Sequence, residues 1–204
     1  MGLSAREDIL SRVRAAVRDV PADEPLEPSP YEPPQARDGD VVARFAERVS
    51  DYRATVREAG SLAATILAVC TEHDARRLGL PVGLLEGWQP DELELVGDDG
   101  LTAQQLDALD GAISGCALAI AETGTIVLDG GRRSGRRALT LVPDLHVCLV
   151  DRRDVVATVS DAIRALDGGR GPFTFVSGPS ATSDIELDRV EGVHGPRRLE
   201  VLLV

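Results

Sequence analysis

Apolar residues recur with a helical period over the first twenty positions. Ser4 and Glu7 have the spacing of a capping box, which predicts a helix over 4–19. One stripe of this helix is apolar and consists of Ile9, Leu10, Val13, Ala16, Val17 and Val20. The following segment, 21–40, holds six prolines together with acidic residues, so it cannot continue the helix and has little to bury. We therefore expect a helical arm with an extended linker over 1–40, and an α/β domain over 41–204.

The helical period returns at the start of the expected domain. A helix is predicted over 41–59, with Asp40 as its cap and Gly60 as its end. A second helix is predicted over 61–72, and 75–80 has the composition of a short strand. The inward positions of the second helix are Leu62, Ile66, Leu67 and Cys70.

From residue 93 onward, strand-like runs alternate with helical ones. Strands are expected at 93–96, 116–121, 125–128, 146–150, 173–176 and 199–204. Helices are expected at 102–110, capped by Thr102, and at 154–166, which has an amphipathic pattern. The run 146–150 is apolar throughout, as in a strand that is covered on both faces. This alternation predicts an α/β fold with a mostly parallel sheet flanked by helices.

Composition excludes several classes of function. The formal net charge is −12 and every cationic side chain is an arginine, because the chain contains no lysine. A phosphate-binding loop of the kind that contains a lysine is therefore excluded. Schiff-base chemistry is excluded as well, because it also needs a lysine. The acidic balance argues against nucleic-acid binding. No apolar run is long enough to span a membrane, and the charged N-terminal residues do not match a signal peptide, so we expect a cytoplasmic protein.

The cysteine and histidine patterns predict no metal or cofactor in this chain. Cys70, Cys116 and Cys148 form no C-x-x-C motif, and three thiols cannot supply the four ligands of a typical iron–sulfur cluster. The three histidines form no close pair or H-E-x-x-H motif, so a dedicated zinc site is not expected. The two later cysteines lie in apolar runs, which is typical of buried, inert thiols.

Two loops beside expected strands carry candidate chemistry. In Ala121–Thr125, Glu122 is a candidate nucleophile, base or hydrogen-bond acceptor, although the segment also suits a polar turn with Gly124 at positive φ. The loop 130–137 has four arginines between glycines, which suits either an anion site or a solvated loop. Arg137 is the member that we expect to be ordered, because the apolar pattern resumes at the next residue.

Two further loops lie toward the C-terminus. The segment 177–186 is rich in glycine and hydroxyl residues and has capping-box spacing at Ser183 and Glu186. It suits a helix start that binds phosphate or carboxylate, or equally an ordinary strand-to-helix turn. His194 lies between Gly192 and Gly195, where it is either a general base or anion donor, or a structural residue.

These segments occur in an order that resembles a known family. A-E-T-G-T-I-V-L, R-R-A-L-T-L-V-P-D-L-H-V, G-P-S-A-T-S-D-I-E and G-V-H-G-P-R are together similar to the lactate-utilisation protein C, or LUD-domain, family. The resemblance implies a fold similar to the sugar-phosphate isomerase and CoA-transferase-like superfamily. It also implies a component of L-lactate oxidation to pyruvate that acts with two iron–sulfur partner proteins. The clusters are then expected in those partners and not in this chain.

The resemblance carries over motif residues by position. They are Glu122, Thr123, Gly124, Pro143, His146, Gly178, Pro179, Ser180, Asp184, Glu186, His194, Gly195 and Arg197. Ala181 departs from the pattern, where a larger or basic residue is expected. The candidate catalytic residues are Glu122 and His194. The candidate substrate-binding residues are Thr123, Gly124, Arg137, Gly178, Ser180, Thr182, Asp184 and Arg197.

Two other functions remain open at this point. CoA transferases of the related fold use a glutamate in a short E-x-G turn as nucleophile, so Glu122 also suits a stand-alone acyl- or CoA-transfer enzyme. The same loops suit a binding module for a small carboxylate or phosphate.

Overall fold

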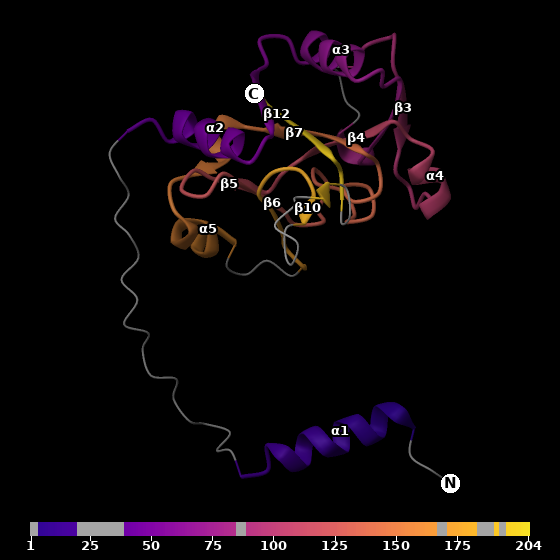
Figure 1. Ribbon diagram of the computed structural model, residues 1–204, viewed down its shortest axis with the longest axis vertical. Coiled ribbons are helices and arrows are strands. Elements are labelled where there is room, and N and C mark those ends of the chain that lie inside the picture. The colour runs from indigo at the N-terminus through magenta and orange to yellow at the C-terminus, as the bar shows by residue number, and fades with distance from the viewer. Residues whose placement is uncertain (1–3, 20–38, 85–88, 167–170, 183–189, 192–194) are drawn as a thin grey trace. The chain divides into compact units, whose positions relative to one another are not determined.

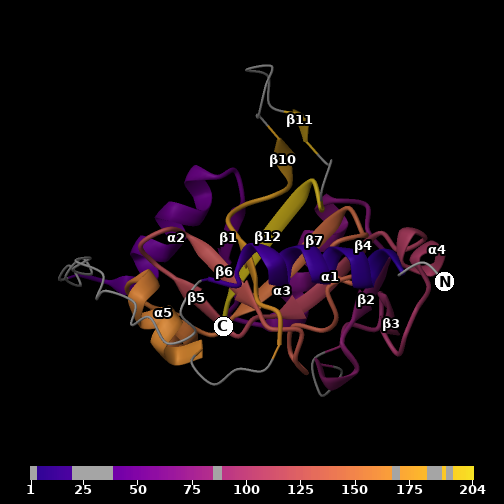
Figure 2. The ribbon, with the colours of Figure 1, turned by 90° about the horizontal axis from the view of Figure 1, so that it is seen from below.

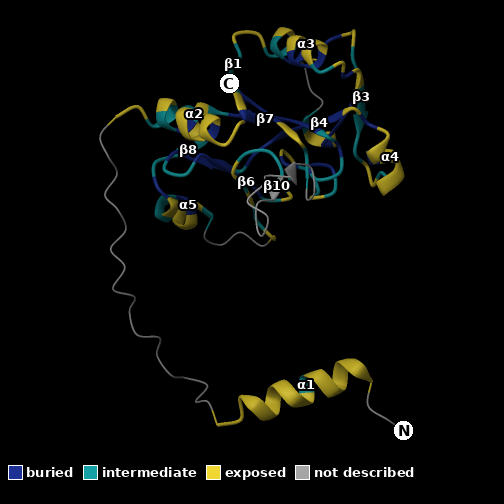
Figure 3. Ribbon diagram, viewed as in Figure 1, coloured by how far each residue is buried: buried dark blue, intermediate teal, exposed yellow. Residues whose placement is uncertain are grey.

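The computed structural model describes residues 4–19, 39–84, 89–166, 171–182, 190–191 and 195–204 (Figure 1). The chain divides into two compact units, 1–33 and 34–204. The first contains α1 (Ala5–Ala16), which confirms the helix predicted over 4–19. Its capping box is also confirmed, because the Ser4 amide donates to Glu7 Oε2 at 2.8 Å and the Glu7 amide donates to Ser4 Oγ at 3.3 Å. No residue of α1 is buried (Figure 3).

A six-stranded parallel sheet forms the centre of the second unit. Its strand order is β1-β12-β7-β4-β2-β3, and every pairing within it is parallel. The strands are β1 (Thr55–Glu58), β2 (Arg77–Leu80), β3 (Glu94–Gly97), β4 (Gly111–Gly115), β7 (Leu145–Val150) and β12 (Arg198–Leu203). The sheet confirms the expected α/β class, and four of its strands were predicted within two residues of their bounds: β2, β3, β7 and β12.

A smaller mixed sheet lies beside the first (Figures 1 and 2). Its order is β8-β5-β6-β9, with β8 parallel to β5 and the other pairs antiparallel. These strands are β5 (Leu118–Ile120), β6 (Thr125–Leu128), β8 (Val155–Val156) and β9 (Thr174–Val176). A separate antiparallel pair consists of β10 (Ala181–Thr182) and β11 (Val190–Glu191). The helices are α2 (Val41–Asp51), α3 (Leu62–Glu72), α4 (Ala103–Asp107) and α5 (Val159–Leu166), with short 3-10 turns at Val82–Leu84 and Arg152–Asp154.

The core lies on both faces of β7, whose six residues are all buried. On one face, Cys148 and Val150 belong to a cluster with Phe45 and Val49 of α2. On the other, residues 145, 147 and 149 belong to a cluster with α3. The alternation confirms the prediction that this apolar run is a strand covered on both sides. Among the described helices, none is long and apolar enough to cross a membrane.

The predicted helix over 41–59 is wrong beyond its third turn. The Asp40 cap is confirmed, because its carboxylate accepts the amides of Val42 and Ala43. However, α2 ends at Asp51, and Arg53 then adopts a φ of 66°. The next residues form β1, which pairs with β12 at the sheet edge. The backbone hydrogen bonds between β1 and β12 therefore outweigh the helical spacing of apolar residues, which continues beyond Asp51 in the sequence.

Two further elements differ from the prediction. The expected helix over 154–166 begins only at Val159, because Val155 and Val156 pair with β5 as strand β8. Strand β4 was not predicted at all, since its sequence G-A-I-S-G has two glycines and little β propensity. All five β4 residues are nevertheless buried. A side chain at Gly111 would come within 3.0 Å of the Leu145 carbonyl oxygen, so glycine permits the close approach of β7.

Candidate functional site

A pocket of about 240 Å³ lies beside the amino ends of β7 and β12 and the segment that follows β9. We call it the small pocket. It is lined by Arg137, Thr140, His146, residues 174–180, Gly195, Pro196 and Leu199. Three of the predicted substrate-binding residues line it: Arg137, Gly178 and Ser180. They come from segments that are about forty residues apart in the sequence, and the fold brings them together.

His146 provides a buried neutral group at this pocket. It is the second residue of β7, is 2% exposed, and its Nε2 lies 2.8 Å from Ser114 Oγ on the neighbouring strand β4. Burial, and secondarily the charge of Arg137, lowers the pKa of His146 to about 4. The imidazole is therefore uncharged at neutral pH, so it can donate or accept a hydrogen bond without carrying a charge.

Arg137 provides the positive charge. Among the described residues its guanidinium has no carboxylate partner, and its one hydrogen bond there is a long contact of 3.4 Å from Nη1 to Thr140 Oγ1. Burial lowers the pKa of Arg137, but an arginine stays charged at physiological pH. A guanidinium in this state can bind a carboxylate through two parallel hydrogen bonds.

Hydroxyl groups connect the predicted A-E-T-G-T turn to the pocket. Thr123 Oγ1 lies 2.7 Å from Thr125 Oγ1, which lies 2.7 Å from Ser177 Oγ. Ser177 lines the pocket, whereas Thr123 contributes only through this chain of hydrogen bonds. The backbone at Gly178 has a φ of 87°, and a Cβ there would lie 2.6 Å from Tyr52 Cβ. Glycine is therefore required where this wall of the pocket packs against the end of α2.

Glu122 and Gly124 have structural contacts in the same turn. The Glu122 carboxylate accepts the Val159 amide at 3.1 Å, at the start of α5, and Glu122 does not line the small pocket. Gly124 has a φ of 62°, and a Cβ there would lie 2.6 Å from the backbone of Arg48, so it permits close packing on α2. The expected positive φ at Gly124 is confirmed. The catalytic role of Glu122 stays a prediction.

The remaining candidates lie beside the pocket or outside the described structure. Arg197 Nε donates to Asp144 Oδ1 at 2.6 Å. The Ser180 amide donates to the Pro196 carbonyl at 2.8 Å, which joins the two loops that line the pocket. The backbone of Thr182 lies in β10, and its side chain is not described. Asp184, His194 and the expected capping box at Ser183 and Glu186 fall outside the described residues.

Sequence reasoning included His146 among the family's motif residues but gave it no role in the site. Thr140 was also not singled out, whereas Ser177 was included as the first residue of the candidate segment 177–186, and both line the pocket. A histidine within a continuous apolar strand is itself a signal, because a buried imidazole needs a hydrogen-bonding partner. That partner, Ser114, lies in the strand that sequence reasoning did not predict.

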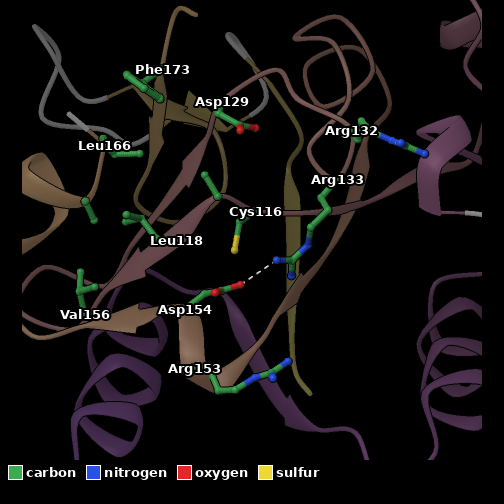
Figure 4. Close-up of a pocket in the computed structure, with 12 residues that line it drawn as sticks. Cys116, Leu118, Asp129, Arg132, Arg133, Arg153, Asp154, Val156, Leu166 and Phe173 are labelled. Atoms are coloured by element: carbon green, nitrogen blue, oxygen red, sulfur yellow. Dashed lines mark hydrogen bonds and ion pairs between the residues drawn. The ribbon is translucent and has the colours of Figure 1, made fainter. Parts of the chain in front are cut away.

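A second, larger pocket of about 640 Å³ lies at the carboxyl ends of β4 and β7 (Figure 4). We call it the large pocket. It is lined by Cys116, Ala117, Leu118, Asp129, Arg132, Arg133, Arg153, Asp154, Val156, Ala165, Leu166 and Phe173. Arg133 Nη1 donates to Asp154 Oδ2 at 2.7 Å across it.

The arginine loop 130–137 is divided between different surroundings. Arg132 and Arg133 line the large pocket, whereas Arg137 lines the small one. Arg136 makes a bidentate pair with Asp98, with both distances 2.7 Å. The four arginines therefore do not form one anion site.

The large pocket offers no thiolate nucleophile. A hydrogen bond with Cys148, followed by burial, raises the pKa of Cys116 well above its usual value, so this thiol stays protonated. The prediction of buried cysteines is confirmed, since Cys70, Cys116 and Cys148 are all fully buried. Within the described parts of the chain, no group of three or more histidine, cysteine or acidic residues is placed to hold a metal ion.

Comparisons with known proteins agree on one family. The model of the LUD domain matches residues 91–204. A relative from Deinococcus radiodurans named "Lactate utilization protein C" is 38% identical over 205 residues, which cover 98% of this chain and 95% of the relative. A protein of the same name from Geobacillus kaustophilus is 31% identical over 137 residues, covering 62% of this chain and 57% of that protein.

A solved structure shares the fold. The crystal structure of a DUF162 family protein from Deinococcus radiodurans aligns with a TM-score of 0.69 and 34% sequence identity. The alignment covers 80% of this chain and 96% of that chain.

Proposed function

Because the chain belongs to the LUD-domain family, we propose that it is a component of a system that oxidises L-lactate to pyruvate, together with two iron–sulfur partner proteins. The name of its full-length relative, lactate utilization protein C, supports this role. The proposal assigns the iron–sulfur clusters to the partners, since the cysteines of this chain are buried in its core. This chain then contributes the binding and orientation of a small carboxylate.

One observation carries the proposal: an arginine without a carboxylate partner among the described residues faces the same pocket as a neutral histidine. A 2-hydroxy acid has a carboxylate beside a hydroxyl group, and its oxidised form has a carbonyl oxygen in place of the hydroxyl. Arg137 would bind the carboxylate, while His146 would donate to, or accept from, the neighbouring oxygen. A volume of about 240 Å³ suits an acid of three carbons better than a large cofactor.

The hydroxyl groups of Thr140, Ser177 and Ser180 would complete this site as neutral hydrogen-bonding groups. Gly178 would allow the backbone to approach the ligand closely, since no side chain fits there. Thr123 would act indirectly, because it holds Thr125 and thereby Ser177. His194, Thr182 and Asp184 remain candidates for closing the site from the neighbouring loop.

The exposed arm helix is the proposed contact with a partner. Ile9, Val13 and Val17 are 58%, 53% and 52% exposed, although they form one apolar stripe. We infer that the arm and linker over 1–40 serve to recruit a partner to the α/β domain over 41–204. Substitution of Ile9 and Val13 by serine should abolish co-purification with the two partners while lactate binding is kept.

The fold supports a more distant relationship as well. A six-stranded parallel sheet beside a smaller mixed sheet is compatible with the sugar-phosphate isomerase and CoA-transferase-like superfamily. An acyl- or CoA-transfer activity would need Glu122 as a nucleophile in an open site. Its Oε2 accepts the Val159 amide, and Glu122 does not line the small pocket, so the lactate proposal gives this side chain no contact with the ligand.

Calorimetric titration of the full chain with L-lactate, pyruvate and acetate tests the proposed site. Arg137→Ala should weaken L-lactate binding about tenfold or more, as expected for the loss of a charge-assisted hydrogen bond. Arg153→Ala is the matched control, because it removes an equal charge from the large pocket and should leave lactate binding unchanged. Acetate should bind more weakly than lactate, since it lacks the second oxygen function.

The same experiments give clear negative results. Equal lactate affinity in wild type and Arg137→Ala would rule out the small pocket as the site. Co-expression of the three proteins without any association would refute the proposed assembly.

A further inference from the structure

The large pocket has the position where α/β proteins commonly bind ligands. Cys116 directly follows β4, and Arg153 and Asp154 follow β7, so the pocket lies outside the carboxyl ends of two adjacent parallel strands. Its volume of about 640 Å³ lies within the range typical of ligand sites. A three-carbon acid would leave most of this space unfilled. The pocket therefore suits a larger ligand than the one proposed for the small pocket.

Two arginines are held at one end of the large pocket (Figure 4). Arg133 is fixed by Asp154 at 2.7 Å, and Arg153 by Asp151 through Nε and Nη2 at 3.0 and 2.6 Å. Arg133 also lies directly over Gly115, where an added Cβ would be 3.2 Å from Arg133 Nε.

These pairs leave donors available. A guanidinium has five N–H donors, and Asp154 accepts only one of those of Arg133. Asp151 accepts from Nε and Nη2 of Arg153, which leaves Nη1 available. The two groups are thus oriented by their acidic partners and can still bind an anion with several oxygens, such as a phosphate.

The opposite end of the pocket is apolar. Leu118, Val156, Leu166 and Phe173 line it, and Figure 4 shows Leu166 and Phe173 away from the two arginines. Phe173 supplies an aromatic ring on which a planar group can stack. This end cannot satisfy a ligand that is polar throughout, such as inorganic phosphate.

Asp129 also lines the pocket and offers an acceptor. Its Oδ1 accepts the Gly131 amide at 2.9 Å and the Ser134 hydroxyl at 2.8 Å. Among the described residues, no such bond reaches Oδ2. A carboxylate oxygen in this position would repel a phosphate but can accept a hydrogen bond from a sugar hydroxyl.

We propose that the large pocket is a nucleotide site. Its phosphates bind Arg133 and Arg153, a ribose hydroxyl donates to Asp129, and the base packs against Leu166 and Phe173. The three parts of the pocket match the phosphates, ribose and base of a nucleotide. The proposed lactate function does not require this pocket. The pocket is independent of the small one, so either site can be present without the other.

The test is calorimetric titration of the full chain with ADP, adenosine, ribose 5-phosphate and inorganic phosphate. ADP should bind most tightly, with each fragment weaker by about tenfold or more, since adenosine and ribose 5-phosphate each lack one of the three contacts and inorganic phosphate lacks two. Arg153→Ala should weaken ADP binding about tenfold. This side chain is 88% exposed, so its removal should leave the fold intact. Arg137→Ala is the matched control and should bind ADP normally.

A second variant tests the base contact. Phe173→Leu keeps an apolar side chain and removes the aromatic ring, so it should weaken ADP while ribose 5-phosphate binds as before. No ADP binding, or equal affinity for ADP and inorganic phosphate, would overturn the nucleotide assignment. Unchanged ADP binding in both Arg153→Ala and Phe173→Leu would show that the nucleotide binds elsewhere. Lactate binding to the small pocket is measured separately, so failure of one proposal does not imply failure of the other.

Discussion

The two pockets use arginine in opposite ways. In the large pocket Arg133 and Arg153 are each paired with an aspartate, whereas Arg137 of the small pocket has no carboxylate partner among the described residues. The small pocket adjoins the amino ends of β7 and β12, whereas the large one lies at carboxyl ends. Pairing orients a guanidinium but offsets its charge, while an arginine without a carboxylate keeps its full charge for a ligand.

The two pockets also differ in their buried, uncharged titratable group. His146 in the small pocket is a buried base whose pKa is lowered, and Cys116 in the large pocket is a buried acid whose pKa is raised. Burial disfavours the charged form of both side chains. Only the histidine titrates in the range that affects stability at mildly acidic pH. We therefore expect mild acid to destabilise the protein through the small pocket, where His146 becomes protonated.

The largest expected effect is the loss of stability in mild acid. In the unfolded chain a histidine binds a proton near pH 6.5, whereas folded His146 does so only near pH 4. The unfolded state therefore binds more protons in this window, and the free energy of unfolding falls by about 3 kcal/mol as pH drops from 6.5 to 4. Urea denaturation at several pH values measures this loss.

His146→Gln is the control for the acid effect, because an amide can keep a hydrogen bond to Ser114 and does not titrate. Its stability should change much less than that of the wild type between pH 6.5 and 4.5. Identical pH slopes in the two proteins would mean that another group causes the loss. The comparison of the two proteins is read above pH 4.5, because at lower pH carboxylates such as Asp151, whose pKa is lowered to about 2, contribute to the loss in both proteins.

Next in size is a pair of glycine substitutions, one for each pocket. Gly178→Ala should lower the free energy of unfolding by about 2 kcal/mol or more, because its φ is 87° and the new Cβ would meet Tyr52 Cβ at 2.6 Å. Gly115→Ala should cost about 1 kcal/mol or less, since its nearest new contact is the side chain of Arg133 at 3.1 Å. Chemical denaturation of both variants compares them. A larger loss for Gly115→Ala would reverse this ranking of the two glycine positions.

The smallest effect is expected for the ion pair of the large pocket. The side chains of Arg133 and Asp154 are 48% and 30% exposed, so Asp154→Asn should change the free energy of unfolding by about 0.5 kcal/mol or less. Its effect should instead fall on ADP affinity, because Arg133 loses the group that orients it. Asp51→Asn, which alters an exposed pair with Arg48 on α2, is the control. A stability loss of several kcal/mol would mean that the pair is structural and does not serve a ligand.

The elements that sequence predicted well are those with local signals. The capping box at Ser4, the Asp40 cap and the apolar run of β7 are each determined by residues within one short segment. The elements that were missed depend on distant partners. Strands β1, β4 and β8 form because β12, β7 and β5 lie beside them, and their own sequences do not indicate a strand.

The candidate site follows the same division. Glycine and hydroxyl content identified Gly178 and Ser180, and the end of the arginine loop identified Arg137, all of which line the small pocket. The role of His146 could not be predicted, because its low pKa results from burial by neighbouring strands. The contact of Glu122 with the start of α5 likewise depends on an element that begins 37 residues later.

The sequence by itself determined the α/β class, the family, the arm helix and the need to build any anion site from arginine, histidine and backbone amides. Only the tertiary structure decided which arginine serves which pocket. Arg133 and Arg137 are four residues apart in one loop, yet Asp154 holds the first at the carboxyl ends of the sheet, while the second lies near His146 at an amino end. A side chain's charge is encoded locally, but its partners, burial and pKa are set by residues that only folding brings near.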